Sequence, residues 1–150
     1  MNARRHLWMG RILILIGLIG VVTGLVPLTS NGLRILFDDG LWNIVDLASH
    51  GVEAMGLSVE WGLLSSAMGT CLGVLLIWAG IRWRRGHEGA VTVTWAYVIV
   101  ALGVNISDMI IFAFRARPGS MRTQMLIFDG IALLIPILLA VRLRRMARRE

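Results

Sequence analysis

The sequence predicts an all-α integral membrane protein, a four-helix bundle that forms a single domain over residues 1–150. Hydrophobic residues make up 57% of the chain and its mean hydropathy is +0.75, both far above the values of a soluble domain of this length. Four apolar runs are each long enough to cross a bilayer. Arginine residues cluster at the ends of these runs, where membrane topology signals lie.

The first predicted span covers about residues 12–28 and follows a basic start with Arg4, Arg5 and Arg11. A secretory signal peptide has the same basic-then-apolar layout. The run closes into P-L-T-S-N-G, which contains no clean small-x-small cleavage site, and three more apolar runs follow. We therefore expect an uncleaved transmembrane helix.

The longest polar interval follows the first span. Within it, apolar residues recur at helical spacing over about 40–56, with acidic residues on the opposite side, which predicts an amphipathic helix on the outer membrane surface. Asp46, His50 and Glu53 form a row on its acidic face and are candidate ligands for a divalent metal ion. A solvated acidic face is the favoured interpretation, because one helix supplies only two or three ligands.

The second, third and fourth spans are predicted over about 62–81, 91–114 and 124–141, and a short turn joins the last two into an antiparallel hairpin. Small residues recur every four positions in the first two spans: Gly20 and Gly24, and Ser65, Gly69 and Gly73. Rows of this kind let helix backbones approach closely, so we expect the first two spans to make the closest contact. Tryptophan residues typical of the membrane interface lie near predicted boundaries: Trp8, Trp61 and Trp83.

The orientation follows from the arginine count. With both termini in the cytoplasm, the inner segments hold eleven arginine residues and the outer segments hold four, namely Arg34, Arg115, Arg117 and Arg122. This distribution satisfies the positive-inside rule and predicts a multi-pass protein of a bacterial inner membrane with cytoplasmic N- and C-termini.

Composition excludes several classes of function. The net charge of +6 would suggest nucleic acid in a soluble protein, but here arginine marks the ends of membrane spans, so we expect the lipid bilayer and no nucleic acid as a partner. Cys71 is the one cysteine, which excludes an internal disulfide and a paired-cysteine redox centre. No P-loop, Rossmann turn, Ser-His-Asp order or zinc signature is present, and we expect no cofactor.

Polar residues inside the last two spans are the candidate site. Asn105 and Asp108 lie in the third span and Asp129 in the fourth. An ionisable residue within a membrane segment costs about 2.5–3.5 kcal/mol on insertion scales and is a functional-site candidate by default. Both carboxylates are expected roughly 8–9 Å below the outer helix ends, with Ser66 of the second span at a similar level. Since the inner halves of the spans are almost wholly apolar, the sequence predicts a polar vestibule in the outer half.

Two interpretations of the carboxylates stay open. Asp108 could pair with Arg115, and Asp129 with Arg122, in partly buried ion pairs that hold the hairpin together. Alternatively, the two carboxyl groups face each other, and they relay protons, bind a cation or act as general acid and base on a lipid-soluble substrate.

The order of segments resembles a known plan. A short basic start, the glycine-bearing run G-L-I-G-V-V-T-G, an outer amphipathic stretch and three further spans ending in arginine follow one another. This layout is similar to that of the small bacterial four-helix membrane proteins of the DoxX-like kind. The resemblance implies a four-helix fold and assigns no role to any residue.

We therefore expect a non-enzymatic integral membrane protein, an accessory or a lipid- or partner-binding bundle that works with a membrane-protein partner or as a homo-oligomer. Two alternatives use Asp108 and Asp129: a proton- or cation-handling transporter component, and an intramembrane enzyme acting on a lipid or a quinone.

Overall fold

Four helices make up the described part of the chain in this computed structural model, which covers residues 3–37 and 55–148, with side chains described for 7–29 and 55–148. They are α1 (Ala3–Phe37), α3 (Val59–Arg84), α4 (Ala90–Phe114) and α5 (Ser120–Ala147). Each is long and apolar enough to cross a membrane, and the described residues contain no strand. The predicted all-α fold with four membrane-spanning helices is confirmed.

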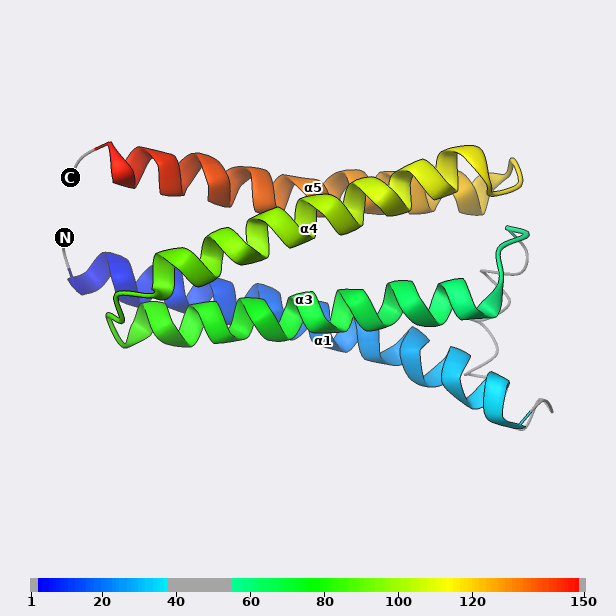
Figure 1. Cartoon of the computed structure of the whole chain (residues 1–150), viewed down its shortest axis with the longest axis horizontal. Coiled ribbons are helices and arrows are strands. Elements are labelled where there is room, and N and C mark those ends of the chain that lie inside the picture. Colours follow the sequence, from blue (N-terminus) through cyan, green and yellow to red (C-terminus); the bar gives the residue numbers. More distant parts are fainter. Residues whose placement is uncertain (1–2, 38–54, 149–150) are drawn as a thin grey trace.

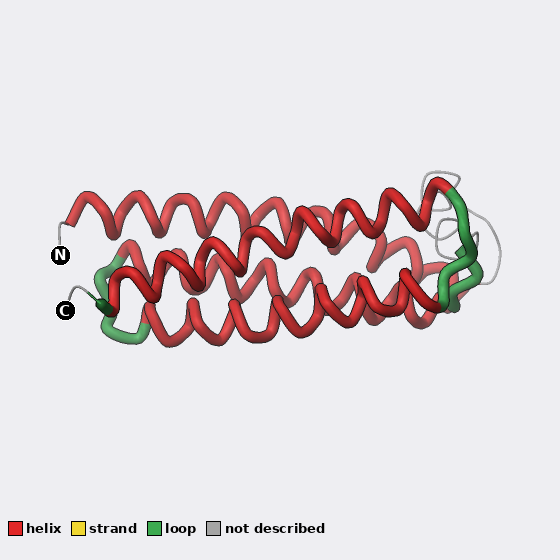
Figure 2. Tube along the Cα trace, turned by 90° about the horizontal axis from the view of Figure 1, so that it is seen from above, coloured by secondary structure: helices red, strands yellow, loops and turns green. Residues whose placement is uncertain are grey.

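The helices run along the long axis of the molecule, with turns at both of its ends (Figures 1 and 2). We call the end that holds both termini the arginine-rich end; its described arginines beyond the first helix are Arg82, Arg84, Arg85, Arg142, Arg144, Arg145 and Arg148. The far end holds the turn between α4 and α5. Near the arginine-rich end α4 lies beside α3, and it then runs away from α3 toward α5 (Figure 1). The α3–α4 contact is smaller than the α1–α3 and α4–α5 contacts.

The helices are longer than predicted, most of all α1. The predicted span ends near residue 28, whereas α1 continues to Phe37 with Pro27 inside it. Proline removes one backbone donor, yet the loss of that one hydrogen bond does not end this helix. The Thr29 hydroxyl donates to the carbonyl oxygens of Leu25 and Val26, at 2.9 Å each, within the same helix. The amphipathic helix predicted over about 40–56 falls almost wholly on residues 38–54, which lie outside the described residues.

The α1–α3 contact is the most extensive in the bundle, as the small-residue rows predict. The contact line, however, follows a seven-residue spacing on α1: Gly10, Gly17 and Gly24. A Cβ atom at Gly17 would lie 2.7 Å from the carbonyl oxygen of Gly73, so only glycine fits there. Gly69, which the predicted four-residue row includes, has open space at its Cβ position. Nearly antiparallel helices contact each other about every 3.5 residues, and a seven-residue repeat therefore fits better than a row of fours.

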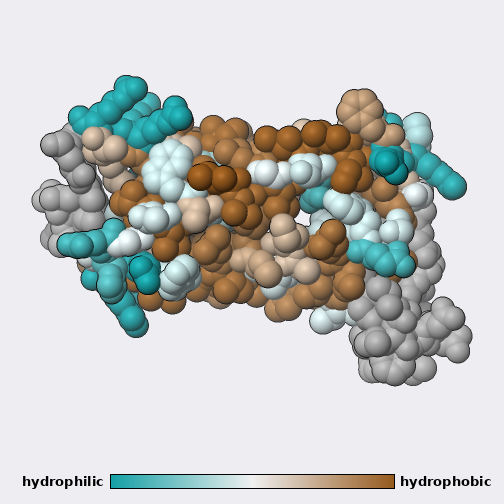
Figure 3. Space-filling view, in the orientation of Figure 1, coloured by the Kyte–Doolittle hydropathy of each residue, from teal (hydrophilic) through white to brown (hydrophobic). Residues whose placement is uncertain are grey.

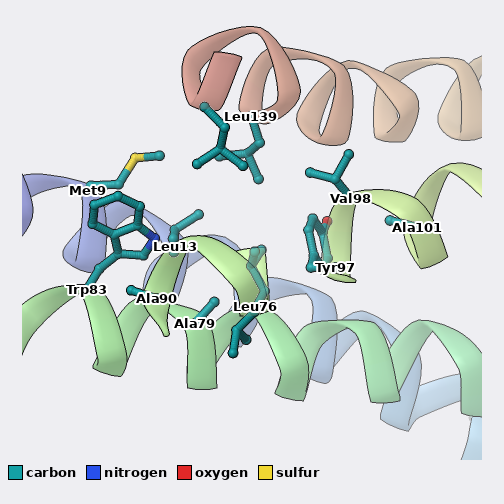
Figure 4. Packing of buried hydrophobic residues seen from close by; sticks show 12 residues of the cluster. Met9, Leu13, Leu76, Ala79, Trp83, Ala90, Tyr97, Val98, Ala101 and Leu139 are labelled. Carbon is teal, nitrogen blue, oxygen red and sulfur yellow. The ribbon is translucent and has the colours of Figure 1, made fainter. Parts of the chain in front are cut away.

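The apolar core fills the arginine-rich half of the bundle, where all four helices contribute (Figure 4). Its fully buried members include Trp83, which is 2% exposed, so its ring faces the core and not the surrounding lipid as a residue of the aromatic belt would. The indole Nε1 of Trp83 donates to the Thr94 hydroxyl at 2.8 Å, and that hydroxyl donates to the Ala90 carbonyl oxygen at 2.7 Å. Because its N–H group has a partner inside the protein, the ring can be buried, and it fastens α3 to α4.

A second, smaller apolar cluster lies at the far end and consists of Met55, Phe112 and Ala116. The backbone N–H of Arg117 donates to the Met55 carbonyl oxygen at 2.8 Å. The Arg117 side chain also packs over Gly56, whose φ of +73° favours glycine. These contacts tie the segment before α3 to the turn between α4 and α5.

Candidate functional site

A band of polar side chains separates the two apolar clusters along the bundle axis. Ser65 and Asp108 each lie six residues from the far end of their helix, roughly 9 Å along the axis. Asp129 lies nine residues after Ser120, about 14 Å along its helix and one turn deeper than Asp108. The sequence placed the two carboxylates at equal depth, and the difference arises because α5 begins at Ser120 and not near Gln124.

Ser65 and Asp108 join α3 to α4 within this band. The Ser65 hydroxyl donates to the Asp108 carboxylate over 2.9 Å, and both side chains are partly buried. The two residues are 43 positions apart in the chain, so the bond is a tertiary contact. It orients the carboxyl group of Asp108 at the line where α3 and α4 separate.

Asp129 lies close enough to Asp108 to feel its charge, but one of its own carboxylate oxygens has no hydrogen-bond partner among the described residues. The two carboxyl groups interact electrostatically. The Oδ2 atom of Asp129 is buried and accepts no hydrogen bond within the part of the chain that the structure describes. A buried polar atom without a partner costs free energy and needs an explanation, such as a ligand, a bound proton or a water molecule.

The arginine residues proposed to pair with these carboxylates do not do so among the described residues. Arg115 is exposed at the end of α4, and Arg122 is half-buried in the first turn of α5. Helical side chains tilt toward the helix N-terminus, which leads the stem of Arg122 away from Asp129. The ion-pair interpretation therefore does not describe this hairpin.

Two other candidate residues bond within their own helices. The Asn105 amide Nδ2 donates to the Ala101 carbonyl oxygen at 2.7 Å. The Ser66 hydroxyl donates to the Gly62 carbonyl oxygen at 2.6 Å, and the Ser66 backbone lies against Gly24 of α1. Ser66 thus belongs to the α1–α3 contact, and its neighbour Ser65 faces Asp108. The seven-residue repeat of glycines on α1 is the signal that could have fixed this helix phase from the sequence.

A cavity of about 310 Å³ lies beside Asp108 between α3 and α4. It exists because Trp83 and Thr94 hold the two helices together at one end while α4 departs from α3 at the other. In Figure 3, a hollow lies between the helix pairs toward the far end, with pale and teal residues above it and on its right and brown residues on its other sides. The lining residues are Trp61, Leu64, Ser65, Met68, Val100, Gly103, Val104, Ser107 and Asp108.

The cavity wall is mainly apolar with a few polar groups. The carboxylate of Asp108 supplies acceptors, and the hydroxyl of Ser107 lies beside it on the same wall. The indole Nε1 of Trp61 is buried and is an unpaired donor within the described ranges. Sequence reasoning placed Trp61 only at the interface, and no spacing in the sequence points to its role in a cavity. Such a wall suits an amphipathic molecule that offers both a donor and an acceptor.

The residues of the predicted metal site are not among those that the structure describes. Asp46, His50 and Glu53 fall outside the described residues. Within residues 7–29 and 55–148, whose side chains the structure describes, no group of three or more His, Cys, Asp or Glu side chains is arranged to hold a metal ion.

Comparison with known proteins gives no family: no family model, curated protein or solved structure matches the chain. The DoxX-like resemblance thus stays a prediction from the order of segments. The fold and the cavity define the protein as a four-helix, multi-pass membrane bundle with a mainly apolar cleft between α3 and α4 that carries a few polar groups.

Proposed function

We propose that this protein binds a lipid-soluble molecule in the cleft between α3 and α4, with Asp108 as the polar anchor, and that it acts without catalysing a reaction. The observation that carries the proposal is the cavity of about 310 Å³, whose apolar wall contains the bonded Ser65–Asp108 pair and the unused Trp61 donor. Its volume is near the lower end of ligand pockets, which suits the head of an amphipathic molecule better than a whole lipid.

Access from the bilayer supports a lipid-soluble ligand. Apolar clusters lie along the bundle axis on both sides of the cavity, and both cavity-lining helices are apolar enough to span a membrane. Leu64, Met68 and Val100 line the cavity and are exposed on the protein surface. In a bilayer these side chains meet acyl chains, so a ligand enters sideways between α3 and α4 with its apolar tail along them.

The head of the ligand needs two features. A hydroxyl or amine group donates to Asp108, and an ester, carbonyl or hydroxyl oxygen accepts from the Trp61 indole. The free hydroxyl and ester oxygens of a diacylglycerol fit both requirements, which makes a photoreactive diacylglycerol a suitable probe.

The proposal also includes the orientation of the bundle in the membrane. By the positive-inside rule, the arginine-rich end faces the cytoplasm of a bacterial inner membrane. The cleft then opens into the outer leaflet.

A second candidate is proton or cation handling by Asp108 and Asp129. It is favoured by one observation: a buried Asp129 oxygen has no hydrogen-bond partner within the described residues, and Asp129 lies close enough to Asp108 for their charges to repel. Four helices leave little room for a path within one chain, so this function requires an oligomer.

The experiment that tests this proposal fills the cavity with a larger side chain and measures whether the ligand still binds. Gly103 lines it, and a Cβ atom placed there meets nothing within 4 Å, so Gly103→Leu occupies the cavity without disturbing a close contact. Gly130 on α5 has the same open space and does not line the cavity, which makes Gly130→Leu the matched control. We expect Gly103→Leu to lose photolabelling by the diacylglycerol probe and Gly130→Leu to retain it. Equal labelling of the two variants would contradict the proposal.

A further inference from the structure

A second cavity, of about 350 Å³, lies at the arginine-rich end and is separate from the cleft. It is bounded by the first turns of α1 and the last turn of α3. Among the residues whose side chains the structure describes, it is lined by Leu7, Ile81, Arg84 and Arg85. Apolar and cationic side chains thus share one small concave surface.

Close packing of α1 on α3 builds this surface. A Cβ atom at Gly10 would lie 2.5 Å from the Cγ atom of Arg84 and 2.6 Å from the Gly80 carbonyl oxygen. The absence of a side chain at Gly10 therefore lets the stem of Arg84 pack directly on α1. An arginine whose stem is packed in this way keeps its guanidinium group beside the cavity with less loss of side-chain entropy on binding.

The two cavity arginines have no anionic partner in the part of the chain that the structure describes. Both are exposed, and neither forms an ion pair there. Arg82, in the same turn of α3, differs because its guanidinium carbon lies 4.6 Å from the centre of the Trp78 ring. Arg84 and Arg85 are therefore available for an anion, and guanidinium groups match the geometry of phosphate oxygens.

The cavity lies at the boundary between apolar and polar surface. The membrane-spanning helix α3 ends at Arg84, with Arg82 also in its last turn, and the apolar Leu7 of α1 lines the cavity beside it. Trp8, beside Leu7, is 66% exposed, as expected of an aromatic residue at the membrane interface. A small soluble anion would make no apolar contact with Leu7 and Ile81, whereas the glycerol and upper acyl chains of a phospholipid pack on such side chains.

We propose that this cavity binds an anionic phospholipid, whose phosphate pairs with Arg84 and Arg85 and whose upper chains pack on Leu7 and Ile81. The site stands apart from the cleft between α3 and α4 and does not depend on what that cleft binds. It makes the lipid composition of the leaflet at the arginine-rich end a determinant of how firmly α1 is held on α3.

The experiment compares phosphatidylglycerol with phosphatidylcholine of the same acyl chains, bound to the full chain in mild detergent and counted by native mass spectrometry. The test variant is Arg84→Gln with Arg85→Gln. Its matched control is Arg144→Gln with Arg145→Gln, which removes the same charge at the same end but from α5, away from the cavity. A third variant, Arg84→Lys with Arg85→Lys, keeps the charge, and circular dichroism checks that every variant is helical.

We expect the wild type to bind phosphatidylglycerol several-fold more tightly than phosphatidylcholine. The glutamine pair on α3 should abolish this preference, while the α5 pair keeps it and the lysine pair keeps part of it. The proposal is overturned if both glutamine pairs weaken the preference equally, which would indicate general surface charge. It is also overturned if the lysine pair loses the preference completely, or if millimolar inorganic phosphate displaces phosphatidylglycerol from the wild type.

Discussion

The Ser65 hydroxyl donates a 2.9 Å hydrogen bond to the Asp108 carboxylate and joins α3 to α4 in their far half. This bond gives the cleft a polar anchor with a fixed orientation, because both side chains come from helices and not from a loop. The same carboxylate can bond to Ser65 and still accept from a ligand, since an ionised carboxylate has about four acceptor sites.

Replacing either Ser65 or Asp108 should lower the affinity of the cleft for its ligand. Ser65→Ala removes one neutral donor and should lower affinity for the diacylglycerol probe by about 1 kcal/mol, roughly fivefold. Asp108→Asn removes the charge and should lower it by about 1.5–3 kcal/mol. Glu60→Gln is the control, because Glu60 is an exposed carboxylate at the start of α3 that does not line the cavity. Competition binding measures all three, and an Asp108→Asn variant with wild-type affinity would refute the anchor.

The buried bond between Trp83 and Thr94 should dominate the stability of the α3–α4 contact. Thr94→Val keeps the shape of the side chain but leaves the indole without its hydroxyl acceptor at a site where Thr94 is 0% exposed. A buried polar group that loses its partner costs about 1–3 kcal/mol. Thermal unfolding in detergent measures the change. Thr92→Val, at an exposed position of the same helix, should leave the melting temperature nearly unchanged.

Alanine substitution can distinguish a helix contact that follows the seven-residue glycine spacing on α1 from one that follows the predicted four-residue row. Gly17→Ala places a Cβ atom 2.7 Å from a backbone oxygen of α3, so the helices must move apart and the protein should lose stability. Gly69→Ala meets open space, and the better helix propensity of alanine should stabilise the helix by up to about 1 kcal/mol. If Gly69→Ala proves the more damaging change, the helix phase described above is wrong.

The sequence predicts the fold well, because hydropathy and length are enough to find membrane helices. It predicts the α1–α3 contact, but small residues occur on several faces of α1, and the four-residue row gave the wrong phase where the seven-residue repeat that contains Gly17 marks the contact line. For the same reason the sequence favours Ser66 as the site residue of this helix. In the structure Ser65 bonds to Asp108, and Ser66 bonds within its own helix. The cavity itself could not be predicted, because it depends on the departure of α4 from α3, which no local pattern records.

Membrane orientation can be tested with single cysteines in a Cys71→Ala background. Ser120→Cys lies at the far end and Ala147→Cys at the arginine-rich end, and both positions are exposed. If the arginine-rich end is cytoplasmic, a membrane-impermeant maleimide labels Ser120→Cys in spheroplasts and labels Ala147→Cys only after lysis. The reverse pattern would place the cleft in the inner leaflet.

Proton or cation flux separates the two candidate functions. A binding protein reconstituted in vesicles should show no flux above that of empty vesicles when a pH or potassium gradient is applied. Flux that disappears in Asp129→Asn, but persists in the Glu60→Gln control, would instead establish transport through the carboxylate pair.

The position of the photolabel tests the central claim most directly. The wild-type protein in lipid nanodiscs is irradiated with the photoreactive diacylglycerol, digested, and mapped by mass spectrometry. If the cleft binds this molecule, the label lies on cavity residues of α3 and α4, such as Met68, Val100 and Val104, and excess unlabelled diacylglycerol removes it. Label spread over exposed residues of all four helices, such as Leu15 and Leu138, and insensitive to competitor would mean that the protein meets the probe only as bulk lipid.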